Sequence, residues 1–177
     1  MFDIETSYPY HRIGDHSGLN FNRKYVQHLT IYSFRTDSYP YLIEVEHYPH
    51  NIYVLKFYRR LHKNNKERYN LMANEYKCSR IVGTCFSVFM DIYSKNPLAS
   101  FGFLGSHTID RIKGIIEPKS ETKRFRIYKQ AVINYFGIET FTHFSDPERS
   151  IYLAISNKNK NVFKISDEAN KILDSLL

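Results

Sequence analysis

The sequence is poor in several residue types that would assign it to a common class. It has no tryptophan, two cysteines, seven glycines and six prolines among 177 residues. Low glycine and proline contents argue against wholesale disorder. Cys78 and Cys85 fall on one predicted helix, about 10 Å apart at a rise of about 1.5 Å per residue, which is too far for a disulfide. A reducing, cytoplasmic compartment is therefore expected.

The sequence also lacks long apolar runs and short catalytic motifs. No stretch is long enough to span a membrane, and no N-terminal run resembles a signal peptide. There is no Walker loop, no Gly-x-Ser-x-Gly elbow and no dinucleotide fingerprint. The eight histidines are scattered without ligand spacing, and the cysteines do not form a zinc pair, so no metal site is predicted. A histidine acting as acid or base in RNA cleavage stays open.

Positive charge is present in excess. The chain has 25 Lys and Arg against 18 Asp and Glu, a net charge of +7 and an isoelectric point near 9.3. Such a balance favours anionic partners such as nucleic acid, phosphorylated cofactors or acidic surfaces.

Hydrophobic patterns predict three strands, a helix, a strand, a helix, two strands and a last helix. Alternation indicates strands, an apolar stretch with only Asp91 charged indicates a buried helix, and Ser120 is a plausible helix cap. The predicted ranges are strands at 23–35, 41–48, 52–58, 99–104, 139–144 and 150–157, and helices at 81–93, 121–136 and 166–177.

A strand–helix–strand unit set among hairpins favours an α/β (α+β) fold with a single mixed sheet of about six strands. At this length one domain over residues 1–177 is expected. It would comprise an irregular arm at 1–22, a core at 23–157 and an amphipathic C-terminal helix at 166–177.

Two basic segments are candidate phosphate-binding sites. The first follows the third strand, with Tyr58 and Tyr69 beside it as stacking residues for a nucleobase. The second begins a helix, where cations oppose the helix dipole and therefore suggest an anionic partner. A solvated surface is the alternative for both. The candidate residues are Arg59, Arg60, Lys63, Lys66 and Arg68, then Lys123, Arg124, Arg126 and Lys129, with Lys119 just before the helix.

Two carboxylates are placed on one face of the second strand. Glu44 and Glu46 are two residues apart, so they share a face and could act as an acid–base pair. They could equally meet Lys56 across the hairpin, and this second interpretation is favoured.

The element order resembles the later part of the GNAT acyltransferase fold over residues 25–157. The stretch from Ala99 to Ser106, followed by the helix ending INYFGIE, is similar to the part of that family where a strand precedes a helix closed by Tyr and Gly. The segment SETKRFRIYKQAVINYF also resembles an uncharacterised family of small bacterial proteins. The resemblance implies acetyl-CoA as cofactor, with Tyr128 or Tyr135 as the acid and Glu46 as the base.

The chain departs from that family at the loop before the central helix. The family's loop is rich in glycine and donates backbone N–H groups to pyrophosphate, whereas residues 59–74 contain no glycine. Cations would have to take over this role.

Three functions follow as hypotheses. The first is a GNAT-like domain that binds a phosphate-rich ligand, preferably RNA, as a bacterial toxin–antitoxin or defence component by analogy. The second is an acetyl-CoA-dependent acyltransferase, which requires a gap between the third strand and the strand at 99–104. The third is a non-enzymatic module that docks Asp167–Leu177 into a partner or forms a homodimer.

Overall fold

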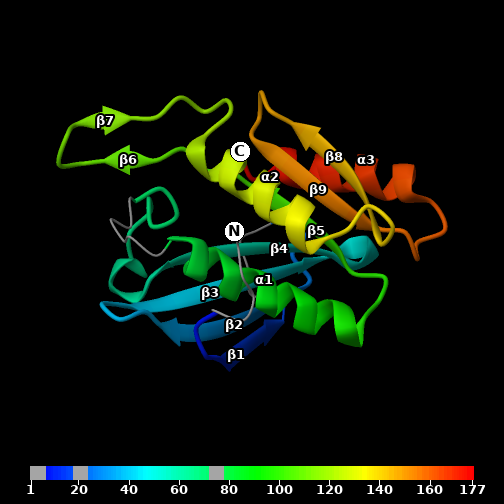
Figure 1. The fold of residues 1–177 in the computed structure, drawn as a ribbon, viewed down its shortest axis with the longest axis horizontal. Helices are drawn as coiled ribbons and strands as arrows, with labels where there is room; N and C mark the ends of the chain where they lie inside the picture. Colours follow the sequence, from blue (N-terminus) through cyan, green and yellow to red (C-terminus); the bar gives the residue numbers. More distant parts are fainter. Residues whose placement is uncertain (1–6, 18–23, 72–77) are drawn as a thin grey trace.

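The computed structural model describes residues 7–17, 24–71 and 78–177. The described residues form a seven-stranded sheet in the order β1-β2-β3-β4-β5-β9-β8, a separate β6-β7 hairpin and three α-helices (Figure 1). The strands are β1 (Tyr10–Ser17), β2 (His28–Arg35), β3 (Pro40–Tyr48), β4 (Ile52–Arg59), β5 (Ser100–Leu104), β6 (Ile109–Asp110), β7 (Ile115–Ile116), β8 (Phe141–Asp146) and β9 (Ile151–Ser156). The helices are α1 (Cys78–Lys95), α2 (Lys123–Tyr135) and α3 (Val162–Asp174), with short 3-10 turns η3 (Pro49–Asn51) and η4 (Arg60–His62).

The first half of the sheet is an antiparallel meander of β1 to β4. Alternation explains its two faces, because successive side chains of a strand point to opposite sides. Tyr41, Ile43 and Val45 of β3 pack under α1, whereas Glu44 and Glu46 point to the other face. The β3–β4 hairpin turns through η3, where His50 and Asn51 take positive φ angles of 64° and 56°.

The second half of the sheet comprises β5, β9 and β8. The crossover through α1 makes β5 parallel to β4, while β9 and β8 are antiparallel to their neighbours. The join between the halves is short: it runs over three residue pairs, from Ile52 with Ser100 to Val54 with Gly102.

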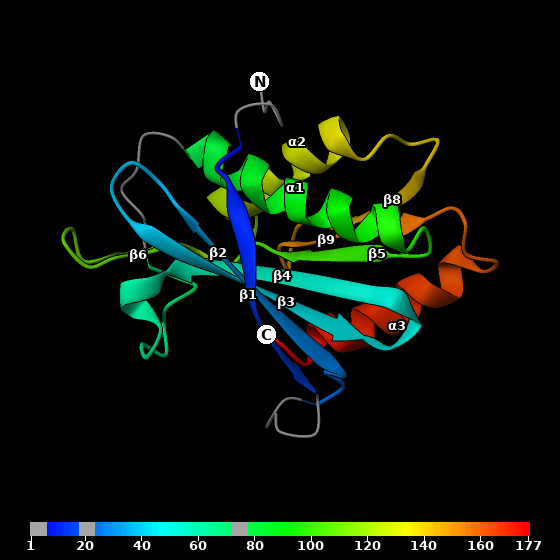
Figure 2. The same ribbon diagram turned by 90° about the horizontal axis from the view of Figure 1, so that it is seen from below.

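Helices cover both faces of the sheet. α1 and α2 lie on one face and α3 on the other (Figure 2). Phenylalanine rings of α1, β5 and α2 form the centre of the core on the α1 face, and Phe89 lies 4.4 Å from Phe101 between ring centroids. On the opposite face Ala169, Ile172 and Leu173 of α3 pack against β4, β5 and β9. This is a layered arrangement in which each amphipathic element buries its apolar side.

Two connections lie at one end of the sheet. The β6–β7 hairpin projects away from it (Figure 1), and its residues Ile112, Ile115 and Ile116 are exposed. The segment from η4 to Leu71 runs beside this hairpin, since Leu71 bridges Ile109. These connections form the border of the site described below.

The predicted fold class is confirmed, and three details are corrected. The sheet has seven strands in the described residues rather than about six. The added strand is β1, in the region predicted as an irregular arm at 1–22; residues 1–6 and 18–22 of that arm lie outside the described part. β1 carries mostly polar, exposed side chains, because an edge strand needs only backbone pairing with β2, so it leaves little hydrophobic pattern.

The helix starts are also corrected. Thr122, rather than Ser120, caps α2, since its hydroxyl accepts from the Phe125 amide at 3.1 Å. Asn161 caps α3, so this helix begins at Val162 instead of near residue 166. The apolar face of α3 packs on the sheet of the same chain. Docking of Asp167–Leu177 into a partner or a dimer mate stays a prediction.

Candidate functional site

The candidate site is a cavity where β4 and β5 stop pairing. The ladder ends at Val54 and Gly102, and a cavity of about 580 Å³ opens beyond it. Leu55, Lys56 and Phe57 of β4 form one wall, opposite the residues that follow β5. This volume falls within the range of about 300–1,000 Å³ that is usual for small-molecule sites. The separation of two adjacent parallel strands therefore creates room for a ligand.

One side of the cavity is apolar. Leu55, Phe57 and Tyr128 line both the cavity and a second void of about 10 Å³. Phe86 and Phe103, whose rings stack at 5.4 Å between centroids, also line that void. The void has room for about one water molecule. The apolar side therefore suits a small apolar group.

The outer part of the cavity is cationic. Its lining includes the cations Lys56, Lys119, Arg124 and Arg149 and one carboxylate, that of Glu148. Lys56 and Arg149 are held in ion pairs with buried or neighbouring carboxylates. Lys119 and Arg124 have no ion pair within the described ranges. These two cations favour an anionic group at the entrance.

The first turn of α2 is fixed tightly against the end of β5. The Thr122 hydroxyl donates to the Gly105 carbonyl at 2.7 Å while accepting from the Phe125 amide. A Cβ atom on Gly105 would lie 2.5 Å from the Cβ atom of Phe125, so no larger residue fits there. This contact fixes the direction of α2 and places Arg124 and Tyr128, one helical turn apart, on the cavity.

Arg124 and Tyr128 differ in how they are held. An Nη of Arg124 donates to the Leu71 carbonyl at 2.9 Å, which ties α2 to the segment after η4. The Tyr128 hydroxyl has no hydrogen bond with any residue in the described ranges. Burial raises the pKa of this phenol, and the charge of Arg124 opposes that rise. Tyr128 therefore stays protonated at neutral pH and has a hydroxyl proton to donate.

A polar network borders the cavity on the β3–β4 side. Glu46 is fully buried, pairs with Lys56 Nζ at 2.9 Å and accepts from the Tyr48 hydroxyl at 2.7 Å. Glu44 accepts hydrogen bonds from the hydroxyls of Tyr58 and Tyr69. The favoured interpretation, that a carboxylate of this strand meets Lys56 across the hairpin, agrees with the Glu46–Lys56 pair.

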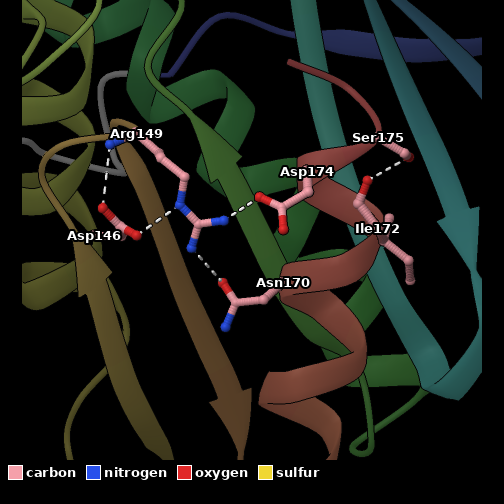
Figure 3. Close-up of polar contacts among 6 residues, drawn as sticks. All are labelled: Asp146, Arg149, Asn170, Ile172, Asp174 and Ser175. Carbon is pink, nitrogen blue, oxygen red and sulfur yellow. Dashed lines mark hydrogen bonds and ion pairs between the residues drawn. The ribbon is translucent and has the colours of Figure 1, made fainter.

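The turn between β8 and β9 is tied to α3 by Arg149 (Figure 3). Its Nε donates to Asp146 at 2.7 Å, and its two Nη atoms contact Asp174 and Asn170. At the end of the same helix the Ser175 hydroxyl donates to the Ile172 carbonyl at 2.6 Å (Figure 3). These contacts hold Ser175, Leu176 and Leu177 at the cavity.

The structure brings only part of the predicted site residues to the cavity. Arg124 and Tyr128 line it. Tyr135 instead stacks on Phe86 at 5.0 Å between ring centroids, and Glu46 lies behind Lys56. Arg59 stacks on the Tyr39 ring at 3.8 Å, away from the lining, and Arg68 contacts Glu44 and Tyr69. The remaining cations are exposed and do not line the cavity: Arg60, Lys63, Lys66, Lys123, Arg126 and Lys129.

The sequence placed Lys56 in the basic stretch 56–68 and His107 among the candidate acid–base histidines, but it did not bring them together with Arg149 in one site. Lys56 is the one cation of the basic stretch before Arg59 on the third predicted strand. His107 and Arg149 lie in connections, and Asn70 donates to the His107 carbonyl at 3.0 Å across the chain. Such contacts depend on tertiary placement, which local pattern does not encode.

Within residues 7–17, 24–71 and 78–177, no group of three or more His, Cys, Asp or Glu side chains could hold a metal ion. None of the helices described is both long and apolar enough to cross a bilayer.

Comparisons of the chain with family models, with curated proteins and with solved structures found no significant match.

Proposed function

We propose that the protein is a GNAT-like acyltransferase that binds an acyl-CoA-type thioester in the cavity between β4 and β5. The separation of β4 and β5, with Tyr128 among the residues that line the cavity, carries this proposal. The element order supports it as well, because residues 28–156 follow the order that the resemblance implies, with the short β6–β7 hairpin inserted.

The two ends of the cavity match the two ends of such a ligand. Lys119 and Arg124 offer charge to phosphate groups at the entrance, and Leu55 and Phe57 offer an apolar surface to an acyl group further in. Cations thereby take the part of the glycine-rich loop, which residues 59–74 lack. Arg is well suited to this, because its planar guanidinium binds phosphate oxygens in pairs.

In the proposed reaction a nucleophile attacks the thioester carbonyl. A bond forms between the nucleophile and the acyl carbon, the carbon–sulfur bond breaks, and the thiolate leaves. Tyr128 is placed to donate its proton to that thiolate, since its phenol is protonated at neutral pH. Tyr135 packs against Phe86 away from the lining, so Tyr128 is the better of the two candidate acids.

A thermal melt with acetyl-CoA tests the proposal. Saturation at a hundredfold the dissociation constant should add about 2.7 kcal/mol to stability, and thus raise Tm by about 5–10 °C for a chain of this size. Arg124→Gln should abolish most of this shift. Arg126→Gln is the matched control, since Arg126 is on the same helix but is exposed and does not line the cavity. An unchanged Tm with acetyl-CoA in the wild-type protein would refute the proposal.

RNA binding is the second candidate, and one observation favours it. Lys63, Lys66, Lys123 and Lys129 are exposed and make no ion pair within the described ranges. Short RNA should therefore run as a parallel ligand in the same melts, at low and moderate salt. A shift that fades as salt rises and is weakened equally by Arg124→Gln and Arg126→Gln would favour this surface over the cavity.

A further inference from the structure

Glu44 is a buried carboxylate with an ordered set of partners. It is 7% exposed on β3, and its Oε1 accepts from the Tyr58 hydroxyl at 2.7 Å. Its Oε2 accepts from the Tyr69 hydroxyl, and an Nη of Arg68 lies 3.9 Å away. The Tyr58 and Tyr69 rings meet edge to face at 5.4 Å between centroids. Tyr58, on β4, and Tyr69, in the segment after η4, thus both donate a hydrogen bond to the Glu44 carboxylate.

Only one of these tyrosines reaches the cavity. Tyr69 belongs to its lining, whereas Tyr58 is 4% exposed and does not. The Tyr69 oxygen also accepts from an Nη of Arg68 at 2.8 Å. Tyr69 therefore lines the cavity, and its hydroxyl is hydrogen-bonded to a buried carboxylate, with a guanidinium beside it to stabilise negative charge.

The position of Tyr69 complements that of Tyr128. Tyr69 comes from the segment after η4, and Tyr128 comes from α2, yet both line the same cavity. An acyl transfer needs a group that takes a proton from the nucleophile and a group that gives one to the leaving thiolate. Tyr128 is suited to the second role, which leaves the first without a residue.

We propose that Tyr69 takes up the proton of the attacking nucleophile and passes its own hydroxyl proton to Glu44. This inference rests on the proposed acyl transfer. For an amine nucleophile, the nitrogen forms a bond to the acyl carbon and loses a proton to the Tyr69 oxygen. The Tyr69 proton moves to the Glu44 carboxylate, the carbon–sulfur bond breaks, and Tyr128 protonates the sulfur. After product release Glu44 returns its proton to the Tyr69 oxygen, Tyr69 releases the proton taken from the nucleophile to solvent, and solvent reprotonates Tyr128.

Tyr69 is the catalytic residue in this scheme, and Glu44 is a positioning residue that acts through it. Glu46 has no comparable path, because its carboxylate is fully buried behind Lys56. Lys56 also lines the cavity, and its Nζ lies 5.5 Å from the centroid of the Tyr69 ring. A paired ammonium there does not accept a proton, so Tyr69 is the better acceptor at this wall.

The experiment compares two equivalent substitutions. Thiol release from acetyl-CoA is followed with methylamine as the acceptor, and kcat/KM is measured across pH for the wild type, Tyr69→Phe and Tyr58→Phe. Each variant removes one hydroxyl that donates to Glu44, but only Tyr69 faces the cavity. Tyr69→Phe should lower kcat/KM by about 100-fold or more, which is the usual contribution of a general base. The loss should appear in kcat, while KM stays the same.

The pH profile separates a chemical role from a structural one. Methylamine must lose its own proton before it attacks, and this step contributes equally to every profile, so each profile is divided by that of Tyr58→Phe. The quotient for the wild type should be constant across pH, whereas the quotients for Tyr69→Phe and Glu44→Gln should vary with pH, because only these two variants lack part of the proton relay. Tyr58→Phe should lose at least tenfold less activity than Tyr69→Phe. Equal losses in the two Phe variants, or a Tyr69→Phe quotient that is constant across pH, would overturn the inference.

Binding keeps the two proposals apart. The acetyl-CoA shift in Tm should be the same in Tyr69→Phe as in the wild type, because the hydroxyl acts on the nucleophile and not on the thioester. Wild-type turnover that Tyr69→Phe does not slow would refute this inference and leave the acyltransferase proposal standing. A wild-type protein that neither binds acetyl-CoA nor releases thiol would refute both.

Discussion

At the scale of single residues, Gly105 occupies a position that has no room for a Cβ atom. A Cβ there would lie 2.6 Å from the Thr122 hydroxyl oxygen and 2.7 Å from the Phe125 amide nitrogen. Real Cβ atoms do not approach other atoms this closely, so a larger residue must push α2 away from the end of β5. The same contact places Arg124 and Tyr128 on the cavity. The stability of the fold and the positions of these two side chains therefore both depend on the absence of a side chain at Gly105.

We expect Gly105→Ala to lower the free energy of unfolding by about 2–3 kcal/mol through overpacking. Gly137→Ala is the matched control, because nothing lies within 4 Å of the added Cβ. That control should change stability by no more than about 1 kcal/mol. Urea unfolding measures both. Equal effects of the two substitutions would show that the close contact at Gly105 does not constrain the fold.

The start of α2 and the contacts of Tyr69 are two details that the sequence did not predict. It assigned the cap of α2 to Ser120, but Glu121 takes a positive φ of 45° and donates its amide to the Pro147 carbonyl at 2.9 Å. The helix therefore starts after Thr122. Arg124 and Tyr128 could be proposed from local pattern, since both stand on a recognisable helix. Tyr69 could be proposed only as a stacking residue, because its contact with Glu44 joins segments 25 residues apart.

At the scale of elements, Arg149 joins a hairpin turn to a helix. It contacts Asp146 in its own turn and Asp174 and Asn170 on α3 (Figure 3). Hydrogen bonding from Arg149 lowers the pKa of Asp146. Because both partners are about one-third exposed, each ion pair should contribute no more than about 1 kcal/mol. The contacts of Arg149 with Asp174 and Asn170 therefore fix the orientation of α3 more than they add to the stability of the fold.

We expect Arg149→Met to lower the free energy of unfolding by about 1 kcal/mol and to speed amide exchange at the end of α3. Arg111→Met is the control, since it also removes a surface pair, with Glu67, but far from α3 in the chain. Hydrogen exchange followed by mass spectrometry gives the comparison. Unchanged exchange between residues 170 and 176 in Arg149→Met would contradict the role given to this clamp.

The Arg149–Asp146 pair predicts that the free energy of unfolding depends on pH. A carboxyl whose folded pKa is lowered stabilises the fold above its unfolded pKa, and this stabilisation is lost as pH falls through the folded pKa. The wild type should therefore lose the Asp146 contribution below its ordinary pKa of 3.8, and Arg149→Met should show a weaker loss there.

Elements with strong periodicity were predictable from sequence. The paired strands β2 to β4, the buried helix α1 and the β8–β9 hairpin all form near their expected ranges. β1 was not predicted, because an exposed edge strand held by backbone pairing carries no apolar alternation. The early start of α3 was missed for a related reason: although Val162 packs against the core, Phe163 is 72% exposed, so the first turn does not show a clean apolar face.

At the scale of the whole molecule, the two halves of the sheet meet over a short join and a large shared core. The backbone join comprises three residue pairs. The core beneath α1 and α2 is more extensive: it includes Phe89, Phe101 and Phe136, with Tyr53 and Leu55 of β4 packed against it. Side-chain packing, more than sheet hydrogen bonding, therefore connects the halves.

We expect the halves to unfold together in one transition. Phe101→Ala should lower the free energy of unfolding by about 3–5 kcal/mol, and circular dichroism and tyrosine fluorescence should report the same midpoint. Phe163→Ala, the same change at an exposed site, should have an effect within about 0.5 kcal/mol. Two separate transitions in the Phe101 variant would mean that the meander and the β5–β9–β8 half are independent units.

The short join also has a consequence for folding kinetics. Hairpins close small loops, whereas pairing β4 with β5 must first close the long connection through α1, at a greater cost in chain entropy. The meander and the β8–β9 hairpin should thus form early, and the three-pair join should form late. The cavity exists only once that join is made, so ligand binding would report the completion of folding.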